Sequence, residues 1–330
     1  MCKKKTLFLL SLLSVTVVLL LSAWVEQVQS QPKYPERAID LICPYGAGGA
    51  TDTNARIVAD WLKRKWGVPI NVINKPGGMT IPGNVEVYNA APDGYTLLAD
   101  CQSSSGMLEV SGVKLPFKVM DRTFIAFYLF SQSVFAVPSK TTMKNLKDLE
   151  AEIKKDPENF TWGSFGRGSS PDFEFRGFLK EIGWDISKTK PVAMGGAAEA
   201  VRLVSGGHVK LAIASVVSFL PPVQAGTARA IAMRGAGRHP FLPDVPTCIE
   251  QGYPYTGNLP LWWAGVSGPP NLPSHVVDTW NRALQEIFKE PAFISKIKDL
   301  GGVPTYVNSG EARRLVEKEI KEAKELWGEK

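Results

Sequence analysis

Histidine and cysteine are scarce in this sequence of 330 residues, which has three histidines and four cysteines. His208, His239 and His275 are far apart, and neither a His-Glu-x-x-His zinc motif nor a Gly-x-Ser-x-Gly nucleophile elbow occurs. The cysteines include no Cys-x-x-Cys pair. These absences argue against a zinc site and against a recognisable hydrolase. We therefore expect no metal and no cofactor, and no catalytic residues.

Runs of basic residues are also missing once the first few residues are set aside. The net charge is +6, and removing Lys3, Lys4, Lys5 and Glu26 lowers it to +4. A nucleic-acid-binding protein needs a concentrated basic patch, which this charge distribution does not provide. Nucleic acid is therefore not an expected partner.

A disulfide framework is not expected either, because only Cys43, Cys101 and Cys248 remain in the exported part of the chain. Cys43 and Cys101 each fall late in an expected strand and could be neighbours. Whether they pair stays open, since disulfide geometry is demanding.

The N-terminus has the composition of a secretory signal peptide at residues 1–30. Three lysines precede an apolar run from Leu7 to Leu21, and small residues follow. Cleavage is expected near Trp24 or Gln31, which predicts a periplasmic protein, and an uncleaved anchor is the alternative. Cys2 precedes the apolar run, so it is not the acylated cysteine of a lipoprotein.

The remaining part of the chain reads as α/β, with mainly parallel strand pairing. Expected strands lie at 39–43, 69–73, 95–100, 123–129, 133–137, 160–163, 190–194, 209–214, 228–233 and 261–266. Expected helices lie at 53–66, 83–90, 172–182, 197–205, 218–225, 273–289, 291–299 and 309–328.

The last three helices have no expected sheet of their own to cover, so we place them on the first group of strands. The chain then crosses between two α/β lobes twice, near residues 136–139 and 238–246. This predicts a hinge and a cleft between a discontinuous lobe (31–137 and 243–330) and a second lobe (138–242).

A glycine-rich turn follows the first expected strand and opens a helix. The turn spans Gly46 to Asp52, and apolar residues at helical spacing follow it. The first N–H groups of such a helix have no partner inside it and favour a carboxylate or phosphate. Gly-x-Gly-x-x-Gly and a Walker lysine are both absent, which argues against a dinucleotide or a nucleoside triphosphate. The alternative is a plain turn capped by Thr51 or Asp52.

Two further segments, Asn74-Lys75-Pro76-Gly77-Gly78 and Pro92-Asp93-Gly94-Tyr95-Thr96-Leu97, complete a distinctive pattern. Together with the first turn they resemble the Bug family, the substrate-binding proteins of tripartite tricarboxylate transporters. The similarity continues through Gly163–Ser169, Gly206–Val209 and Leu242–Thr247. It implies a type II periplasmic-binding-protein fold, with two α/β lobes that close on a small organic acid in the cleft between them.

The resemblance also implies that the turns Gly46–Asp52 and Ser164–Asp172 face each other and hold the carboxylate mainly through backbone N–H groups. The expected ligand-binding residues are Tyr45, Gly48, Gly49, Asp52, Gly77, Gly78, Ser103, Ser104, Ser164, Gly166, Gly168, Ser169, Ser170, Asp172, Gly195 and Ser215. For Asp52 and Asp172, helix capping is the alternative role. Arg167 is either a partner for a second carboxylate or a surface residue, and Trp162, Phe165 and Phe173 are either pocket walls or core.

Asp172 stands where many members of the family have histidine. An acid at that point argues against a polyanion such as citrate, because burying like charges together is costly. The ligand is therefore expected to be a mono- or dicarboxylate.

The expected function is capture of a small carboxylate by a monomer and its delivery to integral-membrane transporter subunits. A ligand sensor that docks on a signalling receptor is the alternative, since sequence does not separate it from transport delivery. An enzyme that uses the cleft for acyl or phosphate chemistry is the third hypothesis.

Overall fold

A six-stranded sheet organises half of the protein. The computed structural model describes residues 33–327, so the signal peptide expected at residues 1–30 lies outside the described part. Everything below concerns the compact unit that begins at Pro35. Among the described residues, no helix combines the length and the apolar character needed to cross a bilayer.

The six strands of this sheet come from both ends of the unit. Their order is β11 (Val303–Asn308), β4 (Thr123–Ser131), β10 (Trp262–Gly268), β3 (Thr96–Cys101), β1 (Ile39–Cys43) and β2 (Ile70–Asn74). β1 pairs in parallel with β2 and β3, whereas β10 runs antiparallel to β3 and β4, and β11 runs antiparallel to β4. All seven residues of β10 are buried, as expected of a central strand covered on both faces.

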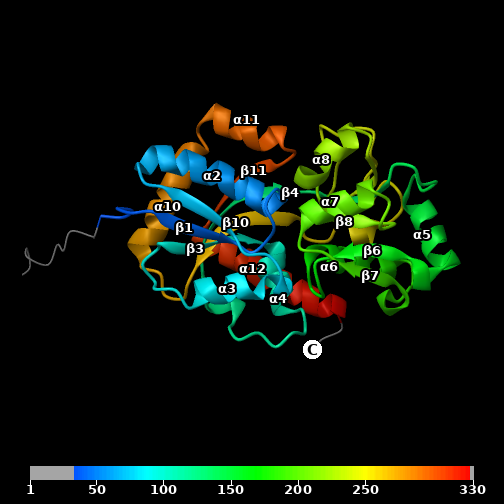
Figure 1. Cartoon of the computed structure of the whole chain (residues 1–330), viewed down its shortest axis with the longest axis horizontal. Coiled ribbons are helices and arrows are strands. Elements are labelled where there is room, and N and C mark those ends of the chain that lie inside the picture. The colour runs from blue at the N-terminus through cyan, green and yellow to red at the C-terminus, as the bar shows by residue number, and fades with distance from the viewer. Residues whose placement is uncertain (1–32, 328–330) are drawn as a thin grey trace, which may run out of the picture. The chain divides into compact units, whose positions relative to one another are not determined.

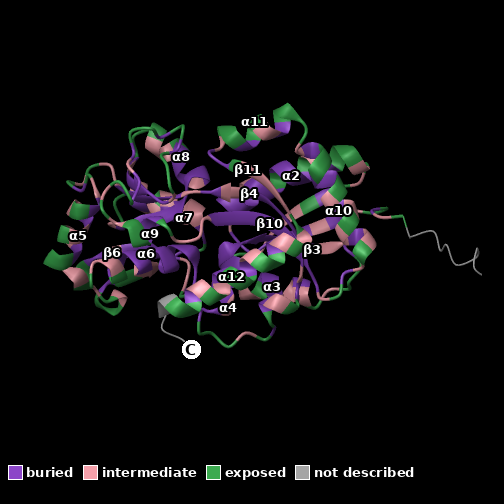
Figure 2. Cartoon of the chain, turned by 180° about the vertical axis from the view of Figure 1, so that it is seen from behind, coloured by how far each residue is buried: buried purple, intermediate pink, exposed green. Residues whose placement is uncertain are grey.

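Helices cover both faces of this sheet (Figure 1). On one face lie α2 (Ala50–Trp66), α10 (Ser274–Ile287) and α11 (Pro291–Asp299), where the rings of Trp66 and Trp280 meet edge to face at 5.0 Å. On the other lie α3 (Ile81–Tyr88), α4 (Gly106–Glu109) and α12 (Ser309–Trp327), which share one apolar cluster with β4 and β10. Figure 2 shows β10 buried between these layers, while the outer faces of α10 and α11 are exposed.

The remaining strands form two smaller sheets. β5 (Ser133–Pro138) lies between β8 (Ala212–Ser215) and β9 (Ala228–Met233), and both pairings are antiparallel. β6 (Thr161–Ser164) pairs in parallel with β7 (Lys190–Ala193). The helices of this part are α5 (Leu146–Lys155), α6 (Ser170–Glu181), α7 (Ala197–Ser205), α8 (Val216–Gln224) and the short α9 (Pro254–Gly257).

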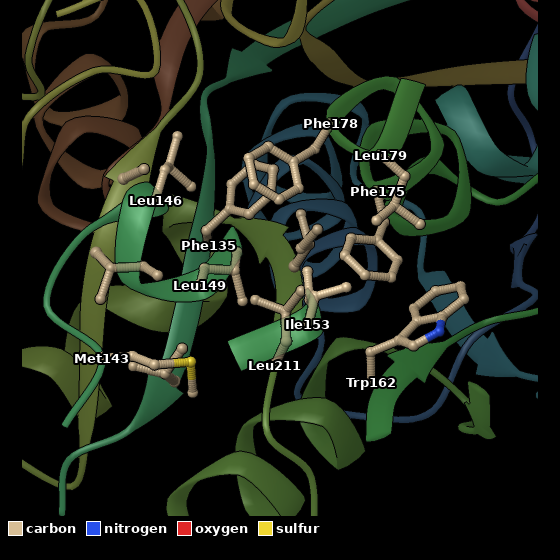
Figure 3. Packing of buried hydrophobic residues seen from close by; sticks show 14 of the residues in the cluster. Phe135, Met143, Leu146, Leu149, Ile153, Trp162, Phe175, Phe178, Leu179 and Leu211 are labelled. Atoms are coloured by element: carbon tan, nitrogen blue, oxygen red, sulfur yellow. The ribbon is translucent and has the colours of Figure 1, made fainter. Parts of the chain in front are cut away.

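An aromatic core joins these smaller sheets to α5 and α6. Phe135 of β5 meets Phe178 of α6 at a ring-centroid distance of 5.9 Å, and Trp162 of β6 meets Phe175 of α6 at 4.9 Å. Figure 3 shows these rings pointing toward one another beside leucines of α5. The aromatic positions of α6 therefore fix the face that this helix turns toward the sheets.

The expectation of mainly parallel pairing is wrong. Parallel pairs join β1 to β2, β1 to β3 and β6 to β7, but every pairing of β4, β5, β10 and β11 is antiparallel. β10 comes from far along the chain and inserts between β3 and β4, a pairing that local alternation does not reveal. The edge strand β11 was not expected, because it is short, half exposed and contains Pro304.

The chain leaves the six-stranded sheet at Gln132, between β4 and β5, which is earlier than the expected crossing at 136–139. β4 and β5 are almost one continuous apolar run, which hid the change of sheet. The return is later than the expected 238–246, because the N–H of Cys248 still donates to the carbonyl of Met233 in β9 at 2.8 Å. The exact lobe boundaries stay a prediction.

Glu319 is a buried carboxylate on α12. Its Oε1 accepts hydrogen bonds from Trp263 Nε1 at 2.8 Å and from Gln102 Nε2 at 3.1 Å, while Oε2 is buried without a partner. Burial raises the pKa of Glu319 from 4.5 to about 8. The folded state therefore holds a proton that the unfolded chain releases above about pH 4.5, so stability falls as the pH rises toward 8.

We expect Glu319→Gln to remove the loss of stability that burial of Glu319 causes as the pH rises toward 8. Thermal unfolding should give similar stabilities for variant and parent near pH 4.5, and at pH 8 the variant should be more stable by on the order of 2 kcal/mol or more. Glu317→Gln, on the exposed face of the same helix, is the control and should not change the pH dependence. A pH profile that is the same for Glu319→Gln and the parent would contradict this assignment.

Candidate functional site

Helix N-termini from both groups of strands meet at one cavity. The first residues of α2 (Ala50, Thr51), of α6 (Ser170, Pro171) and of α7 (Ala197) line it. Ser215, the N-cap residue of α8, lines it as well. Each helix end carries a partial positive charge, so the cavity is arranged to receive an anion.

The α2 end adjoins the α7 end directly. A Cβ added to Gly49, the N-cap residue of α2, would lie 3.9 Å from the backbone nitrogen of Ala198 in α7. Gly49 has an extended backbone with φ −77° and ψ 169°, so its conformation does not require glycine, and a Cβ there would already be in van der Waals contact with the start of α7. The first N–H groups of α2 have no partner inside the helix and are available to a ligand.

Aromatic and acidic side chains complete the wall. Tyr45, Phe165 and Trp262 supply apolar surface, and Cys101, Ser103, Ser133, Ala214 and Glu174 supply the rest. The Sγ of Cys101 donates to the Tyr45 hydroxyl at 3.3 Å. Glu174 is buried and accepts hydrogen bonds from Ser133 Oγ at 2.9 Å and Arg234 Nη2 at 2.8 Å.

The cavity is small, with a volume of about 40 Å³. A smaller hollow of about 10 Å³ lies next to it, shares Tyr45, Ser103 and Phe165, and is lined further by Met79, Gly168 and Ser169. Since one water needs roughly 10–15 Å³ of such volume, the main cavity has the volume of a few water molecules.

The two glycine turns are built on the same plan. In the first turn, Asp52 Oδ2 accepts from the N–H of Gly48 at 2.9 Å and from Arg56 Nε at 3.1 Å. In the second turn, Asp172 Oδ2 accepts from the N–H of Gly168 at 2.9 Å and from Arg176 Nε at 2.9 Å. Gly48 and Gly168 adopt φ values of +81° and +79°, which favour glycine.

Asp52 and Asp172 therefore brace their own turns, and neither lines the cavity. Neither α2 nor α6 has a side-chain N-cap hydrogen bond, so these carboxylates support the turn that precedes each helix and do not cap it. Burial raises the pKa of Asp52, but hydrogen bonds from Arg56, Gly48 and Asn74 outweigh it and hold the pKa below its ordinary value of 3.8.

The argument from Asp172 against citrate loses its basis, because that carboxylate is turned toward Gly168 and Arg176. The acid that reaches the cavity is Glu174, two residues further along α6. Sequence reasoning chose the wrong acid because the direction of each side chain in the first turn of a helix depends on which residue is the N-cap. The sequence did not fix that residue.

Backbone amides of the second turn are mostly used within the protein. The N–H of Gly166 donates to Ser164 Oγ, that of Ser169 to the carbonyl of Gly166, and that of Ser170 to Ser103 Oγ. Pro171 has no N–H. In this structure the bare amides at the cavity are therefore those of α2 and α7, and α6 contributes side chains.

The structure brings five of the expected residues to the main cavity, namely Tyr45, Gly49, Ser103, Ser170 and Ser215. Gly168 and Ser169 line the smaller hollow. The remaining expected residues line neither space: Gly48, Asp52, Gly77, Gly78, Ser104, Ser164, Gly166, Asp172 and Gly195. Ser104 Oγ donates to Asp100, and the N–H of Gly195 donates to Glu199, so both support loops.

Among the aromatic candidates, Phe165 lines the cavity, whereas Trp162 and Phe173 belong to apolar clusters. Cys43, Cys101 and Cys248 are free thiols, so the disulfide left open between the first two is not formed. Burial raises the pKa of Cys101.

Sequence reasoning missed Glu174, Ser133 and Trp262. One sequence feature could have indicated Glu174. It is a charged residue between Phe173 and Phe175, on a helix face that must be buried. Ser133 and Trp262 gave no signal, because they reach the cavity only through the two passages between the sheets.

Two groups of strands with a cavity of helix N-termini between them define the class of periplasmic binding proteins with the two-domain type II fold. The solved structure of the periplasmic binding protein BugD is similar to this chain, with a TM-score of 0.82 and 25% identity over 89% of this chain and 98% of that chain. MatC from Rhodopseudomonas palustris, solved with bound malate, shares the fold at a TM-score of 0.82 and 23% identity, covering 89% of this chain and 99% of that chain.

The particular family follows from the sequence comparisons. The model described as tripartite tricarboxylate transporter family receptor matches residues 54–329. Protein BugT from Bordetella pertussis is 27% identical over 311 residues, which cover 94% of each chain. This chain belongs to the tripartite tricarboxylate transporter receptor family, as its resemblance to the Bug proteins predicted.

We expect Asp52→Ala to lower the free energy of unfolding by about 1–3 kcal/mol at pH 7, because three donors lose a buried acceptor. The difference from the parent should shrink as the pH falls below 3.8, since protonation removes the same contribution from the parent. Asp60→Ala, exposed on the same helix, is the control. Chemical unfolding at pH 7 and pH 3 measures both, and equal losses for the two variants at pH 7 would count against the bracing role.

Proposed function

We propose that this protein is a periplasmic solute-binding protein that captures a small organic carboxylate in the cavity and delivers it to a membrane transporter. The observation that carries the proposal is the meeting of the N-termini of α2, α6 and α7 and the N-cap of α8 at one cavity. The family, and the malate bound to MatC, support a carboxylate as ligand.

Hydrogen bonds and helix ends can supply enough binding free energy without a cationic side chain in contact with the ligand. A charge-assisted hydrogen bond contributes roughly 1.5–3 kcal/mol and a helix end roughly 0.3–2 kcal/mol. A few such contacts reach the ~8 kcal/mol of a micromolar complex after ordering costs. Among the expected ligand-binding residues, we propose that Tyr45, Gly49, Ser103, Ser170 and Ser215 make contact.

Binding is coupled to closure of two lobes in this proposal. We assign β1–β4, β10, β11 and their helices to one lobe and β5–β9 with α5–α9 to the other, with passages at Gln132 and at residues 258–261. The second glycine turn touches the first lobe, since a Cβ on Gly168 would lie 2.6 Å from Ser111 Cα and 2.7 Å from the Met107 carbonyl oxygen. A ligand held from both sides stabilises this closed form, which lets a partner distinguish loaded from empty protein.

The expected signal peptide and the family support a location of this protein outside the cytoplasmic membrane. Its proposed partners are the integral-membrane subunits of a tripartite tricarboxylate-type transporter. The protein would bind them as a monomer in its closed form. No covalent chemistry is part of this function. A ligand sensor that docks on a signalling receptor uses the same closed form and remains the alternative.

Gly49→Val should abolish or strongly weaken carboxylate binding, because the added side chain enters the space between the α2 and α7 ends. We expect a loss of roughly 10- to 100-fold in affinity, measured by calorimetry with the best acid from a thermal-shift screen of mono-, di- and tricarboxylates. Gly46→Val is the control in the same turn, since a Cβ there meets nothing within 4 Å. Unchanged affinity in Gly49→Val would contradict the proposed site.

Gly168→Ala tests closure. The variant should bind the same acid more weakly, because the new Cβ clashes with Met107 of α4 and with Ser111 only when the lobes are closed. Gly207→Ala is the matched control, with φ +74° and nothing within 4 Å, so both variants carry the same backbone strain of roughly 1–2 kcal/mol. Equal affinities in the two variants would show that this contact does not contribute to binding.

A further inference from the structure

Glu174, which lines the cavity, belongs to a buried ion pair with Arg234 that the expected carboxylate contacts do not use. Glu174 is 1% exposed and Arg234 is 0% exposed. Glu174 Oε1 accepts from Arg234 Nη2 at 2.8 Å and from Ser133 Oγ at 2.9 Å. Glu174 Oε2 is buried and has no hydrogen-bond partner.

This unpartnered oxygen belongs to the cavity. Glu174 lines it together with Ser170 and Pro171, which lie one helical turn earlier on the same face of α6. Ser215 Oγ, another lining group, is also buried without a partner. Buried polar atoms are almost always hydrogen-bonded, so both atoms point to a ligand that supplies what the protein does not.

The missing group is a hydrogen-bond donor. Burial raises the pKa of Glu174, and the Arg234 guanidinium and the Ser133 hydroxyl oppose this shift. Oε1 accepts from both of these donors, which makes Glu174 the carboxylate partner of a buried ion pair, and an ionised carboxylate only accepts hydrogen bonds. A second ligand carboxylate at this place would meet like charge, whereas a hydroxyl or an ammonium group would satisfy Oε2. The cavity therefore has two unlike ends, with helix N-termini for an anion and a carboxylate for a donor.

The size of the cavity sets the spacing. The volume is only about 40 Å³, so the helix N-termini and Glu174 that line the cavity lie close together, and a ligand that reaches both must carry its donor close to its carboxylate. Building on the proposed function, we infer that the ligand is a carboxylic acid with a hydroxyl or amino group on the carbon next to the carboxylate, and that Glu174 Oε2 selects it by accepting a hydrogen bond from that group.

The ion pair also connects this contact to both passages between the sheets. Ser133 begins β5 directly after Gln132, and Arg234 Nη1 donates to the carbonyls of Leu259 at 3.0 Å and Pro260 at 2.7 Å. A donor bound to Glu174 is therefore held by the same groups that fix the two crossing segments. This couples recognition of the donor to the relative position of the lobes.

The test compares acids that differ only in the donor, using calorimetry on the purified protein. Lactate should bind roughly 10- to 100-fold more tightly than propionate, or malate more tightly than succinate, the gain of one charge-assisted hydrogen bond. Alanine and aspartate replace the hydroxyl with an ammonium group and show which donor is preferred. Equal affinities within each pair would overturn the inference while leaving the proposed function in place.

Two variants locate the selectivity. Glu174→Met combined with Arg234→Met removes the whole pair, which avoids an uncompensated buried charge, and should bring the affinity ratio within each pair close to one. Glu174→Gln keeps the size and should reduce binding of amino acids most, because its amide group presents N–H donors. Glu152→Met with Lys210→Met removes a half-buried ion pair away from the cavity and should preserve the ratio.

Selectivity that survives in both Glu174 variants would overturn the role of Glu174. Failure of every acid to bind the parent protein would overturn the proposed function and this inference together. Loss of binding to all acids in Glu174→Gln, with an unchanged unfolding temperature, would show that Glu174 serves binding of every acid and does not select for the donor, and would also overturn the inference.

Discussion

The partial positive charge of helix N-termini is the interaction on which the site depends. The starts of α2, α6 and α7 and the N-cap of α8 meet at one cavity, although α2 belongs to one group of strands and the other three to another. An anion placed there is attracted by peptide dipoles that are already oriented, so little reorganisation is needed on binding. The fold can be regarded as two groups of strands that bring these helix ends together.

Polar groups near the cavity divide into those that hold the turns and those left for a ligand. Asp52 and Asp172 fix a glycine N–H and an arginine in each turn, and Ser104 holds Asp100. Glu174 and Ser215 keep an oxygen without a partner. Because an unsatisfied buried polar atom costs free energy, the atoms of this second group indicate which polar groups a ligand must supply.

Much of the organisation could be predicted from the sequence. Strands β1 to β10 and most helices were predicted from the spacing of apolar residues and from the glycines at the turns between them. The turn motifs predicted the family. The sequence failed where long-range pairing decided the outcome, as for β10 between β3 and β4 and for the edge strand β11. In the site, Gly49, Ser103, Ser170 and Ser215 were predicted because each stands at a strand-to-helix junction, a feature that is local in sequence.

By itself the sequence determined an α/β protein of this family, with glycine turns suited to an anion, because helix starts and tight turns depend on neighbouring residues. Only the tertiary structure decided which groups face the cavity. Asp172 and Glu174 are two residues apart on one helix, yet the first turns back to its own loop and the second reaches the cavity. Two positions along a helix differ by about 200° in direction, and only packing against Ser133 and Arg234 fixes which direction is inward.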